Sequence, residues 1–398
     1  MALPDKAEAT LPVVHFTQPR AQFTLDFSVG KLFPVAGGIV VPHGLSPESD
    51  DSSCKTDLNT IMLETTVGIL IERYQLSKHN FREVCMSTVK SLGFGIYQME
   101  LVPMDELYNT TGYLILGKKQ NAIVETGASR SNVVILNSLK ELNISVDDIH
   151  AIIATHIHPD HAGGAGLLMG QCPNAIMYVH ERGLPHLVAP GKLATASRAV
   201  YGESFDSYFH PIIPIPAERV QAVRDGDQLH FIDSPGHALH HMVVYDAETR
   251  GIFTGDAAGI YYPSLEREFG VRVALPSSTP TQFDPEDTLS TLNKMSDLKP
   301  QRLYYTHFGL GEPAGPLLDS TRSWLDLYRK ECVAHYRKYS SLALLAEYLQ
   351  EAVMKRLQKE GVTENPECLW YMKIDNQLNA QGLVAYCERL ERQKKRKT

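Results

Sequence analysis

Short apolar runs alternate with helical patterns through the middle of the chain. "SNVVILNSLKEL" places Val134, Leu139 and Leu142 near one helical face, and "FDPEDTLSTLNKM" opens with a capping residue at Asp284. Strands interleaved with helices predict an α/β layered domain over residues 95–310. The predicted strands are rich in β-branched and aromatic residues and cover 112–117, 122–126, 151–155, 175–180, 228–233, 242–246, 251–255 and 302–306.

The residues before this domain have a mixed pattern. Hydrophobic and polar residues alternate over 23–29, which predicts a half-buried strand, and a helix is expected around 57–90. We attach no chemistry to residues 1–94, which are interpreted as an N-terminal extension of unknown role.

The residues after the α/β domain have a helical pattern. We therefore predict that residues 311–398 form a C-terminal helical segment that packs on the core, and a share in the substrate pocket or in a homodimer stays open. One helix face is predicted from Leu317, Thr321, Trp324, Tyr328 and Cys332, and another begins with Leu342, Leu345 and Leu349.

The composition is that of an ordinary globular protein with a sizeable core. Of the 398 residues 43% are hydrophobic and 21% are charged, and the net charge is −8, which argues against a nucleic-acid partner. No apolar run approaches the ~18 residues of a membrane span, and the first residues lack the apolar stretch of a secretory signal. The six scattered cysteines form no C-x-x-C pair, as is typical of free thiols in a reducing compartment. We therefore expect a cytoplasmic protein with no membrane partner.

Four metal-capable side chains lie within one short stretch, "THIHPDHAGG". His156 and His158 directly follow a predicted strand and are two residues apart, so both can point to one place from an extended backbone. Asp160 and His161 come after Pro159, where the chain must turn. Four ligands on one turn do not suit a single tetrahedral ion, and they favour two ions side by side with further ligands from elsewhere.

The rest of the chain supplies three further candidate ligands. His237 in "SPGH", Asp256 in "TGD" and His307 in "THFG" each come just after a predicted strand. A rigid sheet that holds ligands at its strand ends gives the preorganised geometry that a metal site needs. A lone buried histidine is more often a core residue, but this pattern has seven parts and predicts a metal site.

These motifs closely resemble those of the metallo-β-lactamase superfamily, over about residues 95–310. The resemblance implies an αββα four-layer sandwich with the site at one edge, and "NAQGLVAYCERL" near the end is similar to the helical tails of some members. It also implies the ligand sets: His156, His158 and His237 for one ion, Asp160, His161 and His307 for the other, with Asp256 as the bridge.

Three positions refine this resemblance. Asp256 stands where true β-lactamases of this superfamily usually carry cysteine, so antibiotic cleavage is not expected. His158 stands where flavodiiron oxygen reductases carry glutamate, which favours zinc hydrolysis over iron redox chemistry. Glu125 stands where the family usually has an aspartate that supports the metal ligands by hydrogen bonding, and the role of the longer side chain stays open.

The predicted function is that of a dinuclear zinc-dependent hydrolase that uses a metal-bridging hydroxide to cleave a small ester, lactone or thioester. Asp160 is expected to pass a proton to the leaving group, and Tyr261 or Tyr262 to place a hydroxyl near a substrate oxygen. The long connection over 183–216 is expected to form a pocket wall or lid. Thr155 and Thr306, which each precede a ligand, and one of His240 and His241, which follow His237 closely, are candidates for supporting the ligands.

Three alternatives stay open. The same two-metal site would serve a phosphodiesterase, although the chain lacks a strongly basic pocket signature. An iron-dependent dioxygenase carries a similar histidine motif but uses a single iron. A regulatory binding protein on the same scaffold is the third. We expect two Zn²⁺ per chain, with iron or manganese still open, and a small-molecule substrate.

Overall fold

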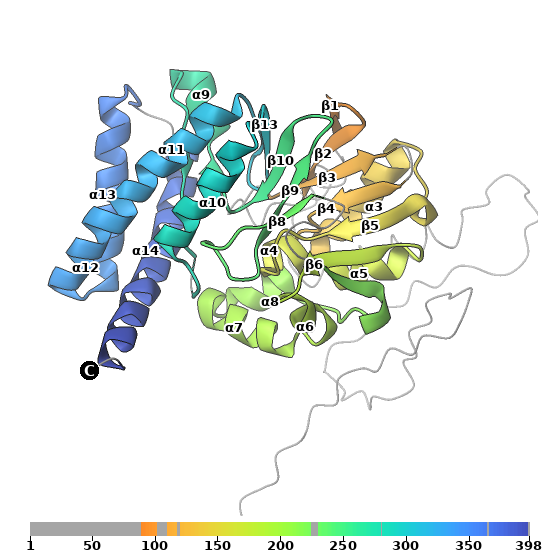
Figure 1. Ribbon diagram of the computed structural model, residues 1–398, viewed down its shortest axis with the longest axis horizontal. Coiled ribbons are helices and arrows are strands. Elements are labelled where there is room, and N and C mark those ends of the chain that lie inside the picture. The colour runs from red at the N-terminus through yellow and green to blue at the C-terminus, as the bar shows by residue number, and fades with distance from the viewer. Residues whose placement is uncertain are drawn as a thin grey trace, which may run out of the picture. The chain divides into compact units, whose positions relative to one another are not determined.

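The computed structural model describes residues 89–396, apart from 102–109, 118–119, 224–229, 280 and 364–365 (Figure 1). The strand expected over 23–29 and most of the helix expected around 57–90 lie outside these residues. Val89 and Lys90, at the end of that expected helix, instead open strand β1 (Val89–Gly93), so the first sheet begins before residue 95.

Two sheets are formed within the described part of the chain. The first has seven strands in chain order, antiparallel from β1 to β4 and parallel from β4 to β7. Its further strands are β2 (Ile96–Leu101), β3 (Thr110–Leu116), β4 (Asn121–Val124), β5 (Ile149–Ile153), β6 (Ile176–His180) and β7 (Val220–Val223). The second has the order β14-β13-β10-β9-β8, in which only β10 and β13 are parallel. Its strands are β8 (Phe231–Asp233), β9 (Met242–Asp246), β10 (Gly251–Gly255), β13 (Arg302–Tyr305) and β14 (Gly309–Gly311), and a separate pair joins β11 (Ile260–Tyr261) to β12 (Ala274–Leu275).

Helices cover the outer faces of both sheets (Figure 1). On the side of the first sheet they are α3 (Asn132–Glu141), α4 (Pro159–Ala162), α5 (Ala165–Gln171), α6 (Leu184–Val188), α7 (Gly191–Tyr201) and α8 (Ser204–Phe209). On the side of the second they are α9 (Pro263–Phe269), α10 (Pro285–Asp297), α11 (Ala314–Asp326), a π-helical turn (Leu327–Cys332), α12 (Val333–Tyr339), α13 (Leu342–Lys359) and α14 (Pro366–Lys395).

Successive side chains of a strand enter different cores, which defines the layers. In β5, Ile152 packs with residues of α3 and α5, whereas Ile153 packs between the two sheets. In β10, Ile252 packs with the C-terminal helices and Phe253 packs between the sheets. The layers therefore run helix, sheet, sheet, helix, and the predicted αββα sandwich is confirmed.

Most of the predicted strands and the capped helix are confirmed. β9 and β10 have the predicted bounds, and α10 begins after Asp284, whose carboxylate accepts hydrogen bonds from the amides of Glu286 and Asp287. The prediction missed β1, β2, β7 and β14 and the short pair β11 and β12. The connection over 183–216 is not an irregular loop but contains α6, α7 and α8.

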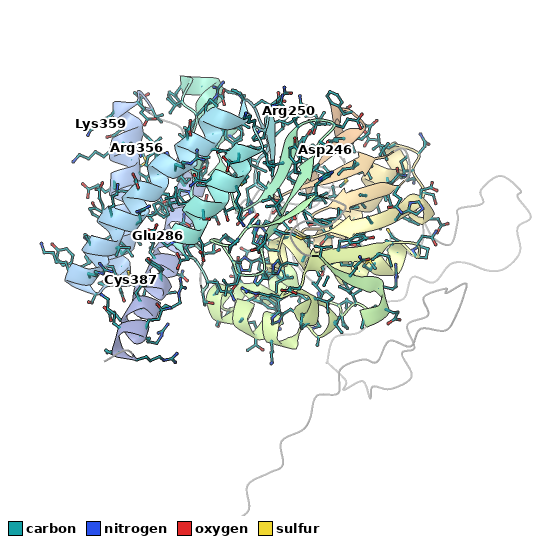
Figure 2. The ribbon with its side chains drawn as sticks, in the orientation of Figure 1. Asp246, Arg250, Glu286, Arg356, Lys359 and Cys387 are labelled. Atoms are coloured by element: carbon teal, nitrogen blue, oxygen red, sulfur yellow. The ribbon has the colours of Figure 1, made fainter. Side chains whose placement is uncertain are left out.

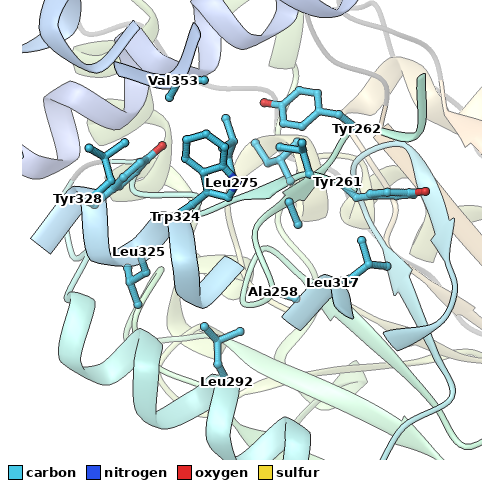
Figure 3. Close-up of a cluster of buried hydrophobic side chains, with 14 of the residues drawn as sticks. Ala258, Tyr261, Tyr262, Leu275, Leu292, Leu317, Trp324, Leu325, Tyr328 and Val353 are labelled. Atoms are coloured by element: carbon cyan, nitrogen blue, oxygen red, sulfur yellow. The ribbon is translucent and has the colours of Figure 1, made fainter. Parts of the chain in front are cut away.

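The C-terminal helical segment is confirmed, and it packs on the second sheet. The predicted face through Leu317, Trp324 and Tyr328 is buried in one hydrophobic cluster (Figure 3). On α13, Leu345 is buried as predicted, but Leu342 is 43% exposed because it lies at the first position of the helix.

Arg356, labelled in Figure 2, links α13 to α11. Its guanidinium carbon lies 3.9 Å from the centroid of the Trp324 ring, and its Nη atoms donate to Ser323. A cation over an indole face adds to the hydrophobic packing below it. This contact helps to fix the helical layer on which α14 rests.

Cys172, Cys332 and Cys387 are buried free thiols, as predicted for these three positions. No helix in the described ranges has the length and apolar character needed to cross a membrane.

Candidate metal centre

All seven predicted ligands lie at one edge of the two sheets, in the segments that follow or connect the strands. His156 and His158 follow β5, and the short helix α4 carries Asp160 and His161. The other three follow strands of the second sheet or lie between them: His237 between β8 and β9, Asp256 after β10 and His307 after β13. The structure thus brings together residues that are up to 151 positions apart in the chain (from 156 to 307).

The first group of three consists of His156, His158 and His237. Nδ1 of His158 lies 2.9 Å from Nε2 of His156 and 3.0 Å from Nε2 of His237. Three ring nitrogens therefore surround one point, as the ligands of a single cation do.

The second group consists of Asp160, His161 and His307. Oδ2 of Asp160 lies 3.6 Å from Nε2 of His161 and 3.7 Å from Nε2 of His307. Four ligands about 2.0–2.1 Å from an ion lie about 3.3–3.4 Å from one another in a tetrahedron, so these separations suit a shared cation.

Asp256 has one carboxylate oxygen toward each group. Its Oδ1 is 3.3 Å from Nε2 of His161 and 3.5 Å from Nε2 of His307, and its Oδ2 is 3.6 Å from Nε2 of His237. Oδ1 of Asp256 and Nε2 of His161 are both buried without a hydrogen-bond partner. Because a buried polar atom without a partner is costly, the donor set fits a bound cation.

Glu125 orients ligands from behind. Its Oε2 accepts a hydrogen bond of 2.6 Å from Nδ1 of His161, and its Oε1 accepts one of 2.7 Å from the amide of Thr155. When the proton is on Nδ1, Nε2 of His161 keeps its lone pair available for a cation held by the second group. The longer side chain thus keeps the supporting role that the resemblance implies.

Further partners fix the other ligands. The Thr155 hydroxyl lies 3.1 Å from Nδ1 of His156. His241 stacks on His156 with ring centroids 4.8 Å apart, and its Nε2 accepts from the amide of Asp256 at 3.2 Å. A Cβ at Gly255 would overlap the Thr155 hydroxyl, so only glycine lets these groups meet. Thr155 and His241, two of the candidates named from the sequence, therefore contact ligands and help to hold them.

Ser277 was not predicted, and it contacts two ligands. Its carbonyl oxygen accepts from Nδ1 of His237 at 3.0 Å, and its hydroxyl donates to Oδ2 of Asp256 at 2.9 Å. Nothing in the sequence around Ser277 resembles a metal motif, since its role depends on the packing of the loop after β12.

The electrostatics favour ligand-competent states of four ligands, His156, His158, His237 and Asp256. Burial lowers the pKa of His237, and burial together with neighbouring imidazoles holds the pKa values of His156 and His158 well below their usual range. Burial opposes ionisation of Asp256, but the imidazoles of His161, His237 and His307 outweigh it and keep its pKa well below normal. Neutral imidazoles and ionised carboxylates are the forms that bind divalent cations. Burial lowers the pKa of His161, but the carboxylates of Asp160, Asp256 and Glu125 outweigh it and hold that pKa well above its usual range, so a cation bound there has to displace a proton.

A small pocket opens beside the second group, and Asp160, Asp256 and His307 line it. Tyr201 of α7 lines it, so the 183–216 connection does supply a wall, and α14 contributes Asp375, Leu378 and Asn379. Burial, and then the carboxylates of Asp160, Asp256 and Asp375, raise the pKa of Tyr201 well above its usual value, which keeps its hydroxyl as a donor.

The structure does not bring Tyr261 and Tyr262 to the site as expected. Both are buried in the hydrophobic cluster under the C-terminal helices (Figure 3), and neither lines the pocket. The hydroxyl of Tyr261 donates to Glu266 at 2.7 Å, and that of Tyr262 donates to Asp375. Packing against α11 and α14, rather than proximity in the chain to Asp256, decides where their hydroxyl groups lie.

The chain is similar in sequence to several proteins of known name. The relative named metallo-beta-lactamase fold-containing protein ST1585, from Sulfurisphaera tokodaii, is 26% identical over 229 residues, which are 55% of this chain and 80% of that protein. Thioesterase pkgB from Emericella nidulans is 28% identical over 38% of this chain, and a hydroxyacylglutathione hydrolase from Albidiferax ferrireducens is 24% identical over 40%. These two matches span only 36% and 51% of the relatives' own lengths.

A solved structure shows the same fold. The metallo-beta-lactamase family protein TTHA1429 from Thermus thermophilus superposes with a TM-score of 0.55 at 21% identity, over 76% of this chain and 95% of that one. The profile of the metallo-beta-lactamase superfamily matches residues 106–307. Because this match runs from the first sheet to the last of the clustered histidines, and covers half of the chain, we conclude that the chain belongs to the metallo-β-lactamase superfamily.

Proposed function

We propose that the protein is a hydrolase with two metal ions, zinc in the first instance, that cleaves a small ester, lactone or thioester. The observation that carries this proposal is the position of Asp256, which turns one oxygen toward each group of three ligands. Two divalent cations held in this way would supply a water of lowered pKa and would polarise the substrate oxygen.

Two side chains of the pocket are proposed to transfer a proton to the leaving group and to bind a substrate oxygen. Asp160 is 12% exposed and lines the pocket, so its carboxylate can hold a proton for the leaving group. Tyr201 lies on α7, whereas Asp160 lies on α4. The hydroxyl of Tyr201 stays protonated and can donate a hydrogen bond to a substrate oxygen in the pocket.

The charge of the pocket favours a carbonyl substrate. Among the described residues that line it, Asp160, Asp256 and Asp375 are carboxylates and none is lysine or arginine. Recognition of a phosphodiester anion commonly uses arginine or lysine, so this lining disfavours a phosphodiesterase. The relatives named thioesterase and hydroxyacylglutathione hydrolase also support an acyl substrate.

Metal content and reporter hydrolysis, measured on one batch of the purified protein, test the proposal. Elemental mass spectrometry is expected to find about two zinc ions per chain. Turnover is expected with a lactone or a thioester and not with bis(p-nitrophenyl) phosphate. Turnover of the phosphodiester alone would establish the phosphodiesterase instead. One iron per chain without hydrolysis would overturn the proposal in favour of the dioxygenase, and bound zinc without any turnover would favour a binding protein.

A further inference from the structure

The C-terminal helix α14 contacts the loop that orients two of the ligands. Asn379 is 1% exposed, and its Oδ1 accepts hydrogen bonds from both the amide (2.7 Å) and the hydroxyl (3.0 Å) of Ser278. The Ser278 hydroxyl also lies 3.0 Å from the carbonyl oxygen of Asn379. On its other side, Nδ2 of Asn379 donates to the hydroxyl of Tyr328 at 3.0 Å. Both ends of this side-chain amide are thus engaged, and one of them holds Ser278.

Ser278 directly follows Ser277, which contacts His237 of the first group and Asp256 between the two groups. Ser277 accepts from His237 through its carbonyl oxygen and donates to Asp256 through its hydroxyl. The carbonyl carbon of Ser277 is bonded to the amide nitrogen of Ser278, which donates to Asn379. The same peptide unit therefore receives a hydrogen bond from a ligand on one side and donates one to α14 on the other.

Gly382 and Arg389 of α14 make further contacts with the segment that follows β12. A Cβ at Gly382, one helical turn after Asn379, would overlap the carbonyl oxygen of Ser278, so the helix and the loop are packed at backbone distance. Arg389 donates to the carbonyl oxygen of Phe283 at 2.7 Å and to Oδ2 of Asp284 at 3.2 Å. The amide of Asp284 in turn donates to the carbonyl oxygen of Gly236, the residue before His237, at 2.7 Å.

We propose that Asn379 is a positioning residue for the metal centre, which acts through the Ser277–Ser278 peptide to fix the ring of His237 and the carboxylate of Asp256. The affinity of the site for its metal ions then depends on the docking of a helix that supplies no ligand itself. The inference rests on the proposed metal centre.

The test measures metal affinity, not turnover, in the full-length chain. Metal-free protein is titrated with Zn²⁺ in competition with a chelating dye, and thermal unfolding of the metal-free form is recorded in parallel. Asn379→Ala removes the acceptor for Ser278. It is expected to weaken zinc binding about tenfold, at the lower end of the 10- to 100-fold loss that follows when a direct partner of a ligand is removed.

Asn376→Ala is the matched control. Asn376 is a buried asparagine on the same helix, and its Nδ2 donates at 2.8 Å to Gln350 of α13, away from the loop. This variant is expected to lower the unfolding temperature and to leave zinc affinity unchanged. Equal loss of affinity in both variants would mean that general destabilisation of α14 is responsible, and the proposal would be wrong.

Ser278→Ala keeps the experiment decisive where Asn379→Ala does not fold. It removes only the hydroxyl that contacts Asn379, and a smaller loss of zinc affinity is expected. Wild-type affinity in Ser278→Ala, with Asn379→Ala unfolded or unchanged, would overturn the role of Asn379. A wild-type protein that binds no zinc would instead refute the proposed metal centre, so the two failures are distinguishable.

Discussion

Replacement of Glu125 by glutamine gives the sharpest test of how the metal ligands are supported. Glu125 is 1% exposed, and each of its two oxygens accepts one hydrogen bond, from His161 and from Thr155. Glutamine has nearly the same shape but only one acceptor oxygen. One of the two donors would therefore face an NH₂ group, and no water can replace the lost acceptor at this depth.

The size of the effect follows from the type of bond that is lost. A hydrogen bond to a charged group contributes about 1.5–3 kcal/mol. At about 1.4 kcal/mol for each factor of ten, this corresponds to metal affinity lowered roughly 10- to 100-fold. We expect the weaker binding mainly for the ion that Asp160, His161 and His307 would hold, because Glu125 fixes the His161 ring directly.

Zinc titration of the metal-free Glu125→Gln variant against a chelating dye measures the loss. Glu266→Gln is the matched control, because Glu266 also accepts two hydrogen bonds, from Tyr261 and Arg272, but lies away from the ligands. Wild-type affinity in Glu125→Gln would refute the supporting role. A loss as large as that of His161→Ala would make Glu125 a ligand itself.

Three other substitutions test separate parts of the structure. Asp256→Ala is expected to reduce the metal content and abolish turnover, and elemental analysis that still finds two ions with full activity would exclude a bridge. Tyr261→Phe should leave kcat unchanged and cost about 1 kcal/mol of stability, because its hydroxyl bonds to Glu266; a tenfold fall in kcat would contradict this. Trp324→Ala should cost about 3–5 kcal/mol in urea unfolding, since the indole is 1% exposed beneath Arg356, and a loss below about 1 kcal/mol would argue against this packing.

The strands that carry the ligands could be predicted because their signals are local. β9 (MVVYD) is an apolar run that ends at Asp246, and β10 (GIFTG) is a short β-rich run bounded by glycines, so their bounds follow from the sequence. β14 could not be found in this way, because two of its three residues are glycine and its pairing with β13 comes from tertiary structure. The helices α6 and α8 are only five and six residues long, too short to show a helical period.

The helices of the 183–216 connection are held by packing. Phe205 and Phe209 of α8 are buried, and Leu378 of α14 packs against the same small cluster. A segment stabilised by a helix about 170 positions further along the chain (378 − 205 = 173) gives no sign of it in its own residues. For the same reason the sequence pointed to a pocket wall here but not to Tyr201.

The ligands and the groups that hold them differ in the same way. A metal ligand is recognisable because its residue type is rare and its place after a strand is regular, as at His156 and His307. The partners of the ligands need only a hydroxyl or a carbonyl oxygen, which nearly every loop offers, so Ser277 has no signal in the sequence. The position of Ser277 depends on the packing of the loop after β12 against α14. In this contact the buried Asn379 accepts a hydrogen bond from Ser278, and Ser277 accepts one from His237. The sequence predicted that the C-terminal helices pack on the core and left open a share in the substrate pocket or in a homodimer, but it gave no link to the ligands. If Asn379 acts as proposed, these helices are where variation in metal affinity should be sought among chains with identical ligands.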